Sequence, residues 1–270
     1  MTLPALASAQ RLATRPAPPG PPWGAMALGA VAVAITVWAA VAIDFTLAPL
    51  WDYQGRGREI LARFLNPDWA FALRVGPKWL ETLSIAVIAS VIGAAIALLG
   101  AQLTSSATNR SAPLRRGMRA LFAVIRSLPD MGWGLLAVAL VGAGSLAGIL
   151  ALIVFNAGII AKLTGESLDA IDRGPLEAAD AAGASAIQRA RFAALPQIMP
   201  TFLSYSLYVF EMNVRASVIL GLVGAGGIGS VIMVELGRFQ YEHISSIVLA
   251  TFVVVLLIDA LSQSVRRSLV

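Results

Sequence analysis

The chain has 270 residues, of which 58% are hydrophobic and 13% are charged. A soluble domain usually has about a quarter of its residues charged, so this composition indicates a polytopic membrane protein. The chain has no cysteine and one histidine, His243, which excludes disulfides and thiolate metal sites and argues against a histidine-built metal site or triad. The net charge of +5 comes from basic residues spread over loop ends, a pattern typical of membrane orientation rather than nucleic-acid binding.

The N-terminal quarter of the sequence predicts a tail, one membrane span and a surface segment. Residues 1–22 are rich in proline and are expected to form a disordered cytoplasmic tail. An apolar run from about Met26 to Ile43 is long enough to approach the hydrocarbon thickness. Residues 44–79 mix tryptophan and tyrosine with charged residues, so we expect them at the periplasmic surface of the membrane. Any helix in this segment is expected to break at 55–57 and 66–68. Residues 23–80 therefore form one predicted unit.

The remaining residues, 81–270, predict a transmembrane core. A second span covers about Leu80–Leu103. Residues 131–161 carry no charge, and as one helix they would be about 46 Å long, which is too long for an upright span and too short for two. The turn sequence at 142–145 divides this run, so the third span is expected to start near Gly117 and the fourth to end near Leu168. One tilted helix is the alternative.

Two more spans, about 197–223 and 244–263, complete an all-α fold with about six transmembrane helices. The side that would hold both termini and the 104–119 and 162–196 loops carries twelve Lys and Arg residues, and the other side carries six. Basic loops favour the cytoplasm, so the sequence predicts a multi-pass protein of a bacterial plasma membrane with cytoplasmic N- and C-termini.

A polar segment, residues 172–196, interrupts the apolar spans. Gly174 is the expected N-cap of a short helix, with Pro175 in its first position and Glu177 at its third, where a carboxylate complements free backbone N–H groups. Gly183 supplies a turn, and a second helix, 184–194, is expected to stop at Pro196.

This segment resembles the coupling loop of ABC importer permeases. The pattern consists of Glu-Ala-Ala, a glycine six positions after the glutamate, and a Leu-Pro pair, and it is carried here by Glu177, Ala178, Ala179, Gly183, Leu195 and Pro196. Ala193 stands where the family usually has isoleucine. The resemblance implies that this loop receives the motion of a separate ATPase, and that the fold is that of a type I importer permease.

Further sequences narrow the resemblance to permeases of phosphonate importers. They are Glu-Thr-Leu at 81–83, Arg-Ser-Leu-Pro-Asp at 126–130, Phe-Glu-Met-Asn-Val-Arg-Ala-Ser at 210–217 and the glycine-rich run at 220–229. The resemblance implies import of phosphonate, phosphite or phosphate. It also implies a second permease chain (identical or paralogous), two ABC ATPase subunits and a periplasmic or lipid-anchored solute-binding protein. ATP and Mg²⁺ would bind the ATPases, because this chain lacks a phosphate-binding loop of the ATPase type.

Charged and polar residues within spans are the candidates for the translocation pathway, since such residues are costly in lipid. The set comprises Arg126, Asp130, Glu211, Asn213, Arg215 and Ser217. Glu211 and Arg215 are four residues apart and can pair on one helix face, either to neutralise each other in the bundle or to pass an anion. Arg126 and Asp130 have the same spacing and can pair with each other or with another span. Asn156 is expected to make an interhelical hydrogen bond, and Glu81 to stand at a helix start.

Other functions remain as alternatives. The same machinery could import methionine or another amino acid. An ATP-independent secondary transporter would predict inverted repeats, which the sequence does not clearly show. A membrane enzyme would need a nucleophile–base pair or a metal cluster, and neither a catalytic, a cofactor-binding nor a metal site is predicted. A dinucleotide site at the Gly-x-Gly-x-x-Gly of 224–229 lacks the strand that such a site requires.

Overall fold

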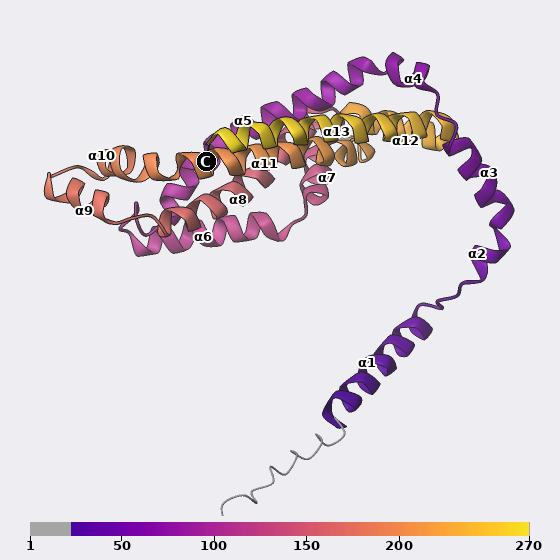
Figure 1. Cartoon of the computed structure of the whole chain (residues 1–270), viewed down its shortest axis with the longest axis horizontal. Coiled ribbons are helices and arrows are strands. Elements are labelled where there is room, and N and C mark those ends of the chain that lie inside the picture. Colours follow the sequence, from indigo (N-terminus) through magenta and orange to yellow (C-terminus); the bar gives the residue numbers. More distant parts are fainter. Residues whose placement is uncertain (1–22, 270) are drawn as a thin grey trace, which may run out of the picture. The chain divides into compact units, whose positions relative to one another are not determined.

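The computed structural model describes residues 23–269, and every regular element in this range is a helix (Figure 1). The predicted tail, 1–22, lies outside the described residues. Contacts divide the chain into two units at Arg58 and Glu59. Five described helices are long and apolar enough to span a membrane, and a bent pair would make a sixth, which agrees with the predicted number.

The first unit contains α1 (Trp23–Ala42), which has no charged residue and matches the predicted first span, and the short helix α2 (Ala48–Asp52). Helix α3 (Gln54–Phe64) begins in this unit and crosses the boundary. It runs through Gly55 and Gly57, where the sequence suggested a break, because two isolated glycines weaken a helix without ending it. The predicted break at 66–68 is present, and Asp68 caps α4 (Trp69–Arg74) by accepting the Phe71 N–H at 3.0 Å.

The second unit is built around the pair α5 (Gly76–Thr104) and α8 (Ser145–Asp169), which pack against each other along much of their length. Small residues make this close approach possible: a Cβ added to Gly93 would lie 2.8 Å from the Asn156 Cβ, and one added to Gly165 would lie 2.6 Å from the Thr104 Oγ1. Asn156 donates to the Ala89 carbonyl at 3.4 Å, so its predicted interhelical hydrogen bond is present. The outward faces of these helices carry exposed Val, Leu and Ile, as expected for lipid contact.

The third predicted span is not one helix. Helices α6 (Ala112–Ser127) and α7 (Asp130–Val141) meet at a bend of 88°. Leu128 and Pro129 both have extended backbone there, because a proline disfavours helix in the preceding residue and has no N–H to continue the ladder. The predicted turn at 142–145 is present, with positive φ at Gly142 and Gly144.

Helix α11 (Leu195–Leu222) and helix α13 (Tyr241–Leu269) match the last two predicted spans. Between them lies a helix that the sequence did not indicate, α12 (Gly227–Gly237). It starts close against the end of α11, where a Cβ on Gly221 would lie 2.5 Å from the Gly226 carbonyl oxygen. Two side chains of α5 cap it: Glu81 accepts the Gly227 N–H at 3.0 Å and Thr82 accepts the Ile228 N–H at 2.8 Å. Glu81 thus stands at a helix start, but at that of α12 and not of its own helix.

Candidate functional site: the coupling loop and the polar residues of the bundle

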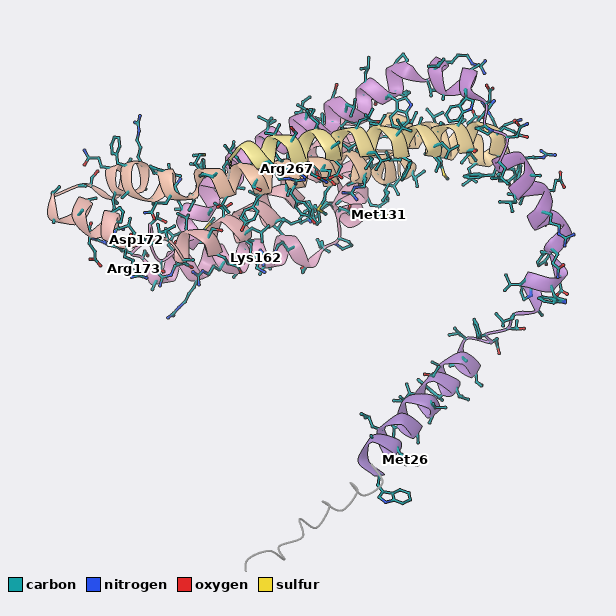
Figure 2. The ribbon with its side chains drawn as sticks, in the orientation of Figure 1. Met26, Met131, Lys162, Asp172, Arg173 and Arg267 are labelled. Atoms are coloured by element: carbon teal, nitrogen blue, oxygen red, sulfur yellow. The ribbon has the colours of Figure 1, made fainter. Side chains whose placement is uncertain are left out.

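The 172–196 segment extends from one end of the second unit as a separate arm (Figures 1 and 2). It contains α9 (Gly174–Ala181), α10 (Ala186–Arg189) and a π-helical turn, Ala190–Ala194, which leads directly into α11. The base of the arm is closed by Gln197, whose side chain accepts the Asp172 N–H at 3.1 Å and donates to the Asp172 carbonyl at 3.2 Å. Both ends of the arm are therefore fixed to each other where it leaves the bundle.

The helix start differs by one residue from the prediction. Arg173 takes the N-cap position, Gly174 is the first helical residue, and Pro175 and Glu177 follow one position later than expected. Asp172 supplies the stabilising acceptor, because its Oδ1 receives the Gly174 N–H at 3.0 Å. Glu177 stays in the first turn, where its charge complements the helix dipole.

The turn of the arm follows the prediction at Gly183, which has a φ of +75°. The second helix then begins at Ala186, with Ser185 and Gln188 forming a reciprocal capping box. The Ser-x-x-Gln pattern of this capping box is present in the sequence, and it would have placed the helix start at Ala186 instead of Ala184. Pro196 does not stop the helix as expected. The Leu195 N–H bonds five residues back to the Ala190 carbonyl, and Pro196 lies in the first turn of α11, where its missing N–H costs little.

One carboxylate, Asp180, fixes the arm to the neighbouring turn of the bundle. It receives Arg110 Nη2 at 3.0 Å and Arg189 Nη1 at 3.3 Å. Arg189 is 7% exposed and also donates to the Thr108 carbonyl at 3.5 Å, so the pairing keeps a buried guanidinium satisfied. The partners of Asp180 lie 70 residues and 9 residues away in sequence, and no local signal could have indicated this three-residue cluster.

The predicted contact residues of the arm lie at its surface. Glu177 and Ala178 are exposed, Ala179 and Leu195 are half-buried, and Leu176 is the buried residue of α9. Two large apolar side chains that the sequence analysis did not select, Ile187 at 81% and Phe192 at 69%, are also exposed. The arm thus exposes both an acidic helix start and two large apolar side chains, which suits contact with a protein partner.

Within the bundle, Glu211 and Arg215 form the predicted pair, with Arg215 Nη2 at 2.6 Å from Glu211 Oε1. Glu211 is buried, whereas half of the Arg215 side chain is exposed. A third member comes from the last turns of α13: Arg266 Nη2 lies 3.5 Å from Glu211 Oε2. The two guanidiniums flank one buried carboxylate, which ties α11 to α13 at the level of the C-terminal end of α13.

Of the other polar candidates, Asn213 and Arg126 bond to neighbouring helices, whereas Ser217 and Asp130 bond locally. Asn213 is 2% exposed and donates to Ser90 Oγ on α5 at 2.7 Å, while the Ser217 hydroxyl bonds to the Val214 carbonyl within α11. The bend separates Arg126 from Asp130: Arg126 donates to the Gly158 carbonyl of α8 at 3.4 Å, and Asp130 accepts the Met131 N–H at 2.8 Å. Of the two expected i,i+4 pairs, only Glu211–Arg215 is formed.

At the opposite end of the second unit, His243 joins three helices. Its Nδ1 lies 2.7 Å from Glu235 on α12, its Nε2 lies 3.5 Å from Asp68 beside α4, and its ring stacks on Phe71 at 3.8 Å. Glu235 is buried and also pairs with Arg238 at 3.1 Å. His243 has no special role in the sequence prediction, because α12 was not predicted and the position of its carboxylate could not be inferred.

Known proteins with similar sequences and folds are membrane transport components. Residues 89–270 match the family described as the binding-protein-dependent transport system inner membrane component. The phosphite transport system permease protein PtxC of Stutzerimonas stutzeri is 37% identical over 194 residues, which is 70% of each chain. The phosphate-import permease protein PhnE of Mycolicibacterium smegmatis is 33% identical over 221 residues, or 82% of this chain and 41% of that protein.

The fold agrees with these matches. A chain of the inward-facing MetNI methionine ABC transporter superposes with a TM-score of 0.64 at 26% identity, covering 74% of this chain and 96% of that one. The family match over residues 89–270 contains α6 to α13 and the second half of α5, and it includes the arm as well as the Glu211 cluster. The chain belongs to the family of inner membrane components of binding-protein-dependent transport systems.

Proposed function

We propose that this chain is the transmembrane permease of an ATP-driven importer for phosphonate or a related phosphorus oxyanion such as phosphite or phosphate. It forms the pathway with a second permease chain, identical or paralogous. Two ATPase subunits bind ATP and Mg²⁺ and contact the arm, and a solute-binding protein delivers substrate from outside. The family description supports the binding-protein dependence, and the names of two relatives, a phosphite and a phosphate permease, support the substrate class.

The exposed arm is the segment through which movement of the ATPase subunits would reach the membrane helices. Glu177 and Ala178 lie at its surface. The Arg110–Asp180 ion pair and the hydrogen bond from Arg189 to the Thr108 carbonyl fix the arm to the bundle. Because the arm continues through the π-helical turn into α11, movement of the arm is passed to the helix that carries Glu211 and Arg215. Closure of the ATPase pair on ATP would thereby change which side of the membrane the pathway faces.

The experiment combines Glu177→Arg with Gly183→Asp. Reversing the exposed charge and placing a side chain at a positive φ should abolish ATPase association and transport, with at least a tenfold loss of uptake, since several charge-assisted contacts are worth about 1.5–3 kcal/mol each. Copurification of the ATPase and uptake of radiolabelled phosphite or phosphonate into cells are the measurements. The control is Glu59→Gln, an exposed carboxylate paired with Arg63 far from the arm in sequence.

Retained ATPase binding and uptake in the double variant would refute the coupling role. A separate binding measurement tests the substrate class: the partner solute-binding protein should bind a phosphorus oxyanion and not methionine. Methionine binding there would overturn the substrate class while leaving the coupling role intact.

A further inference from the structure

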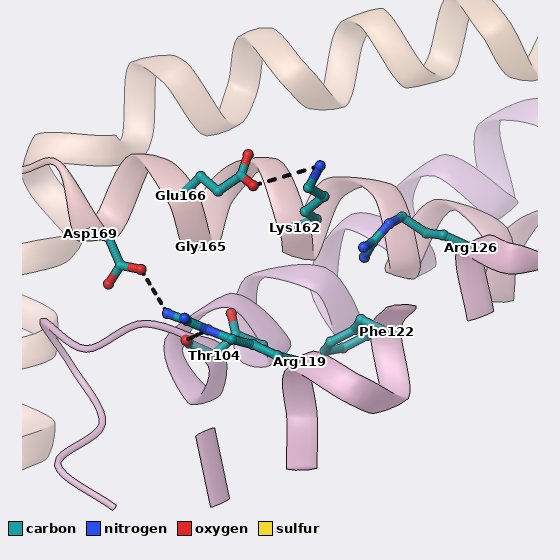
Figure 3. A pocket seen from close by; sticks show the side chains of 8 residues that line it. All are labelled: Thr104, Arg119, Phe122, Arg126, Lys162, Gly165, Glu166 and Asp169. Atoms are coloured by element: carbon teal, nitrogen blue, oxygen red, sulfur yellow. Dashed lines mark hydrogen bonds and ion pairs between the residues drawn. The ribbon is translucent and has the colours of Figure 1, made fainter. Parts of the chain in front are cut away.

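A cavity of about 220 Å³ with several charged side chains in its wall lies between α5, α6 and α8, at the end of the bundle from which the arm extends (Figure 3). Its wall includes three basic side chains, Arg119, Arg126 and Lys162, and two acidic ones, Glu166 and Asp169. Water occupies about 30 Å³ per molecule in the liquid, so the cavity has room for a small polyatomic ion with some of its hydration.

The two carboxylates are not equally committed. Asp169 is held by Arg119 at 2.8 Å and by three hydrogen bonds from Ser105 and Ser106, so its charge is already compensated. Glu166 is 62% exposed and lies 3.6 Å from Lys162 Nζ, a long contact in an exposed pair of the kind that contributes little to stability. An incoming anion can displace Glu166 toward solvent without leaving a buried charge.

Arg126 is the cation that the surrounding charges do not neutralise. Its Nη1 donates to the Gly158 carbonyl at 3.4 Å, and among the described residues no carboxylate pairs with its guanidinium. Gly158 allows it to lie so close to α8, since a Cβ there would come within 3.1 Å of the Arg126 Cγ. Figure 3 shows the Arg126 guanidinium turned toward Lys162 across the cavity.

Arg119 adds a pre-oriented donor. Its Nε donates to the Thr104 carbonyl at 2.8 Å and its Nη2 to Asp169, which fixes the guanidinium at the cavity wall. A guanidinium has five N–H donors, so these two bonds leave three for a ligand. A fixed arginine, a second arginine without a carboxylate and a lysine whose carboxylate partner can be displaced form a site that suits a tetrahedral anion of more than one charge.

We propose that this cavity binds a phosphate-type oxyanion, with Arg126 and Lys162 as its main ligands and Arg119 as a fixed additional donor. The group is either a free oxyanion or the phosphomonoester headgroup of a lipid, since both present the same oxygens. The site goes beyond the transport role, because binding here needs neither the ATPase nor the binding protein. Its position next to Asp169, three residues before the arm begins at Asp172, places the bound anion beside the base of the arm.

The test uses the full-length permease in nanodiscs. Inorganic phosphate is titrated by calorimetry in discs of phosphatidylcholine alone, and a parallel set contains phosphatidic acid, with retained lipid read by native mass spectrometry. Arg126→Gln and Lys162→Gln should each weaken binding about tenfold, the effect of losing one charge-assisted hydrogen bond. Arg126→Lys, which keeps the charge, should lose less, and Arg63→Gln removes one exposed positive charge elsewhere and should change nothing.

Phosphate binding that the two pocket variants weaken identifies a free oxyanion as the ligand. Retention of phosphatidic acid that the variants abolish, without phosphate binding, identifies the lipid headgroup. The proposal is overturned if the wild-type protein binds neither, or if the pocket variants bind as tightly as Arg63→Gln. An elution volume of Arg126→Gln equal to that of wild type shows that its loss of binding is not a folding defect.

Discussion

At the scale of single residues, the buried carboxylate of Glu211 explains how two arginines are tolerated within the bundle. Arg215 lies 2.6 Å from it and Arg266 3.5 Å, from two different helices. An unpaired charge at such a position is costly, so removing Glu211 would affect the fold, whereas removing one arginine leaves the other in place. Arg215, with half of its side chain exposed, is therefore the member free to meet an anion.

Arg215→Ala should lower uptake about tenfold while the protein stays folded, because Arg266 still compensates Glu211. Uptake in cells and thermal unfolding of the purified protein are measured together, and the affinity of the external binding protein for substrate should not change. The matched variant is Arg266→Ala, which removes the more buried partner. It should lower the unfolding temperature more than Arg215→Ala does, and it should lower transport per folded molecule less. Normal uptake by Arg215→Ala would exclude this residue from the pathway.

At the scale of elements, glycines decide where helices touch. Gly148 on α8 faces the backbone of the glycine-rich turn, and a Cβ there would lie 2.7 Å from the Ala225 carbonyl oxygen. A backbone atom cannot move aside as the tip of a side chain can. The contact also joins two turns, since the Gly144 N–H bonds to the Gly224 carbonyl at 2.9 Å.

Gly148→Ala should thus destabilise the protein by about 1–3 kcal/mol, the usual result of forcing extra volume into a packed interface. The control is Gly117→Ala in α6, where nothing lies within 4 Å of the added Cβ and the change should be neutral or slightly stabilising. Both unfolding temperatures are read in the same detergent. Equal temperatures for the two variants would show that the α8 contact is not tight.

Comparing the predicted helices with the observed ones shows which elements the sequence could predict. Long apolar runs located α1, α5, α8, α11 and α13, because a span needs only length and hydrophobicity. The arm was recognised from Glu177 and Gly183, whose roles depend on local backbone. The clusters around Asp180 and His243 could not be predicted, because each joins residues far apart in sequence. Helix α12 was not predicted because its start is capped by Glu81 and Thr82, which lie 146 residues away in sequence. The bend of 88° at Pro129 was not among the predicted breaks, although the proline accounts for it locally.

At the scale of the whole molecule, the direction of insertion decides whether the arm can meet an ATPase. The basic loops favour an arrangement with the arm and both termini in the cytoplasm. The Asp68–His243–Glu235 cluster lies at the other end of the second unit and would then face outward.

Because the natural chain has no cysteine, single cysteines report orientation directly. Ala178→Cys, exposed on α9, should react with a membrane-impermeant maleimide only after the cells are opened. Gln240→Cys, exposed between α12 and α13, should react in intact cells. Labelling of Ala178→Cys from outside would reverse the topology and remove the ATPase from the proposed function.

The π-helical turn at Ala190–Ala194 has a consequence for how the arm can vary between related proteins. From Ala186 the helical ladder runs without an open loop into α11. Each residue of an α-helix turns the chain by about 100°, so a single insertion or deletion in this run would swing Ile187 and Phe192 around to a different side relative to the span. In the proposed coupling role, side chains on the outer surface of the arm can be exchanged one by one to suit a different ATPase, whereas a change in the number of residues between Ser185 and Gln197 would rotate that whole surface.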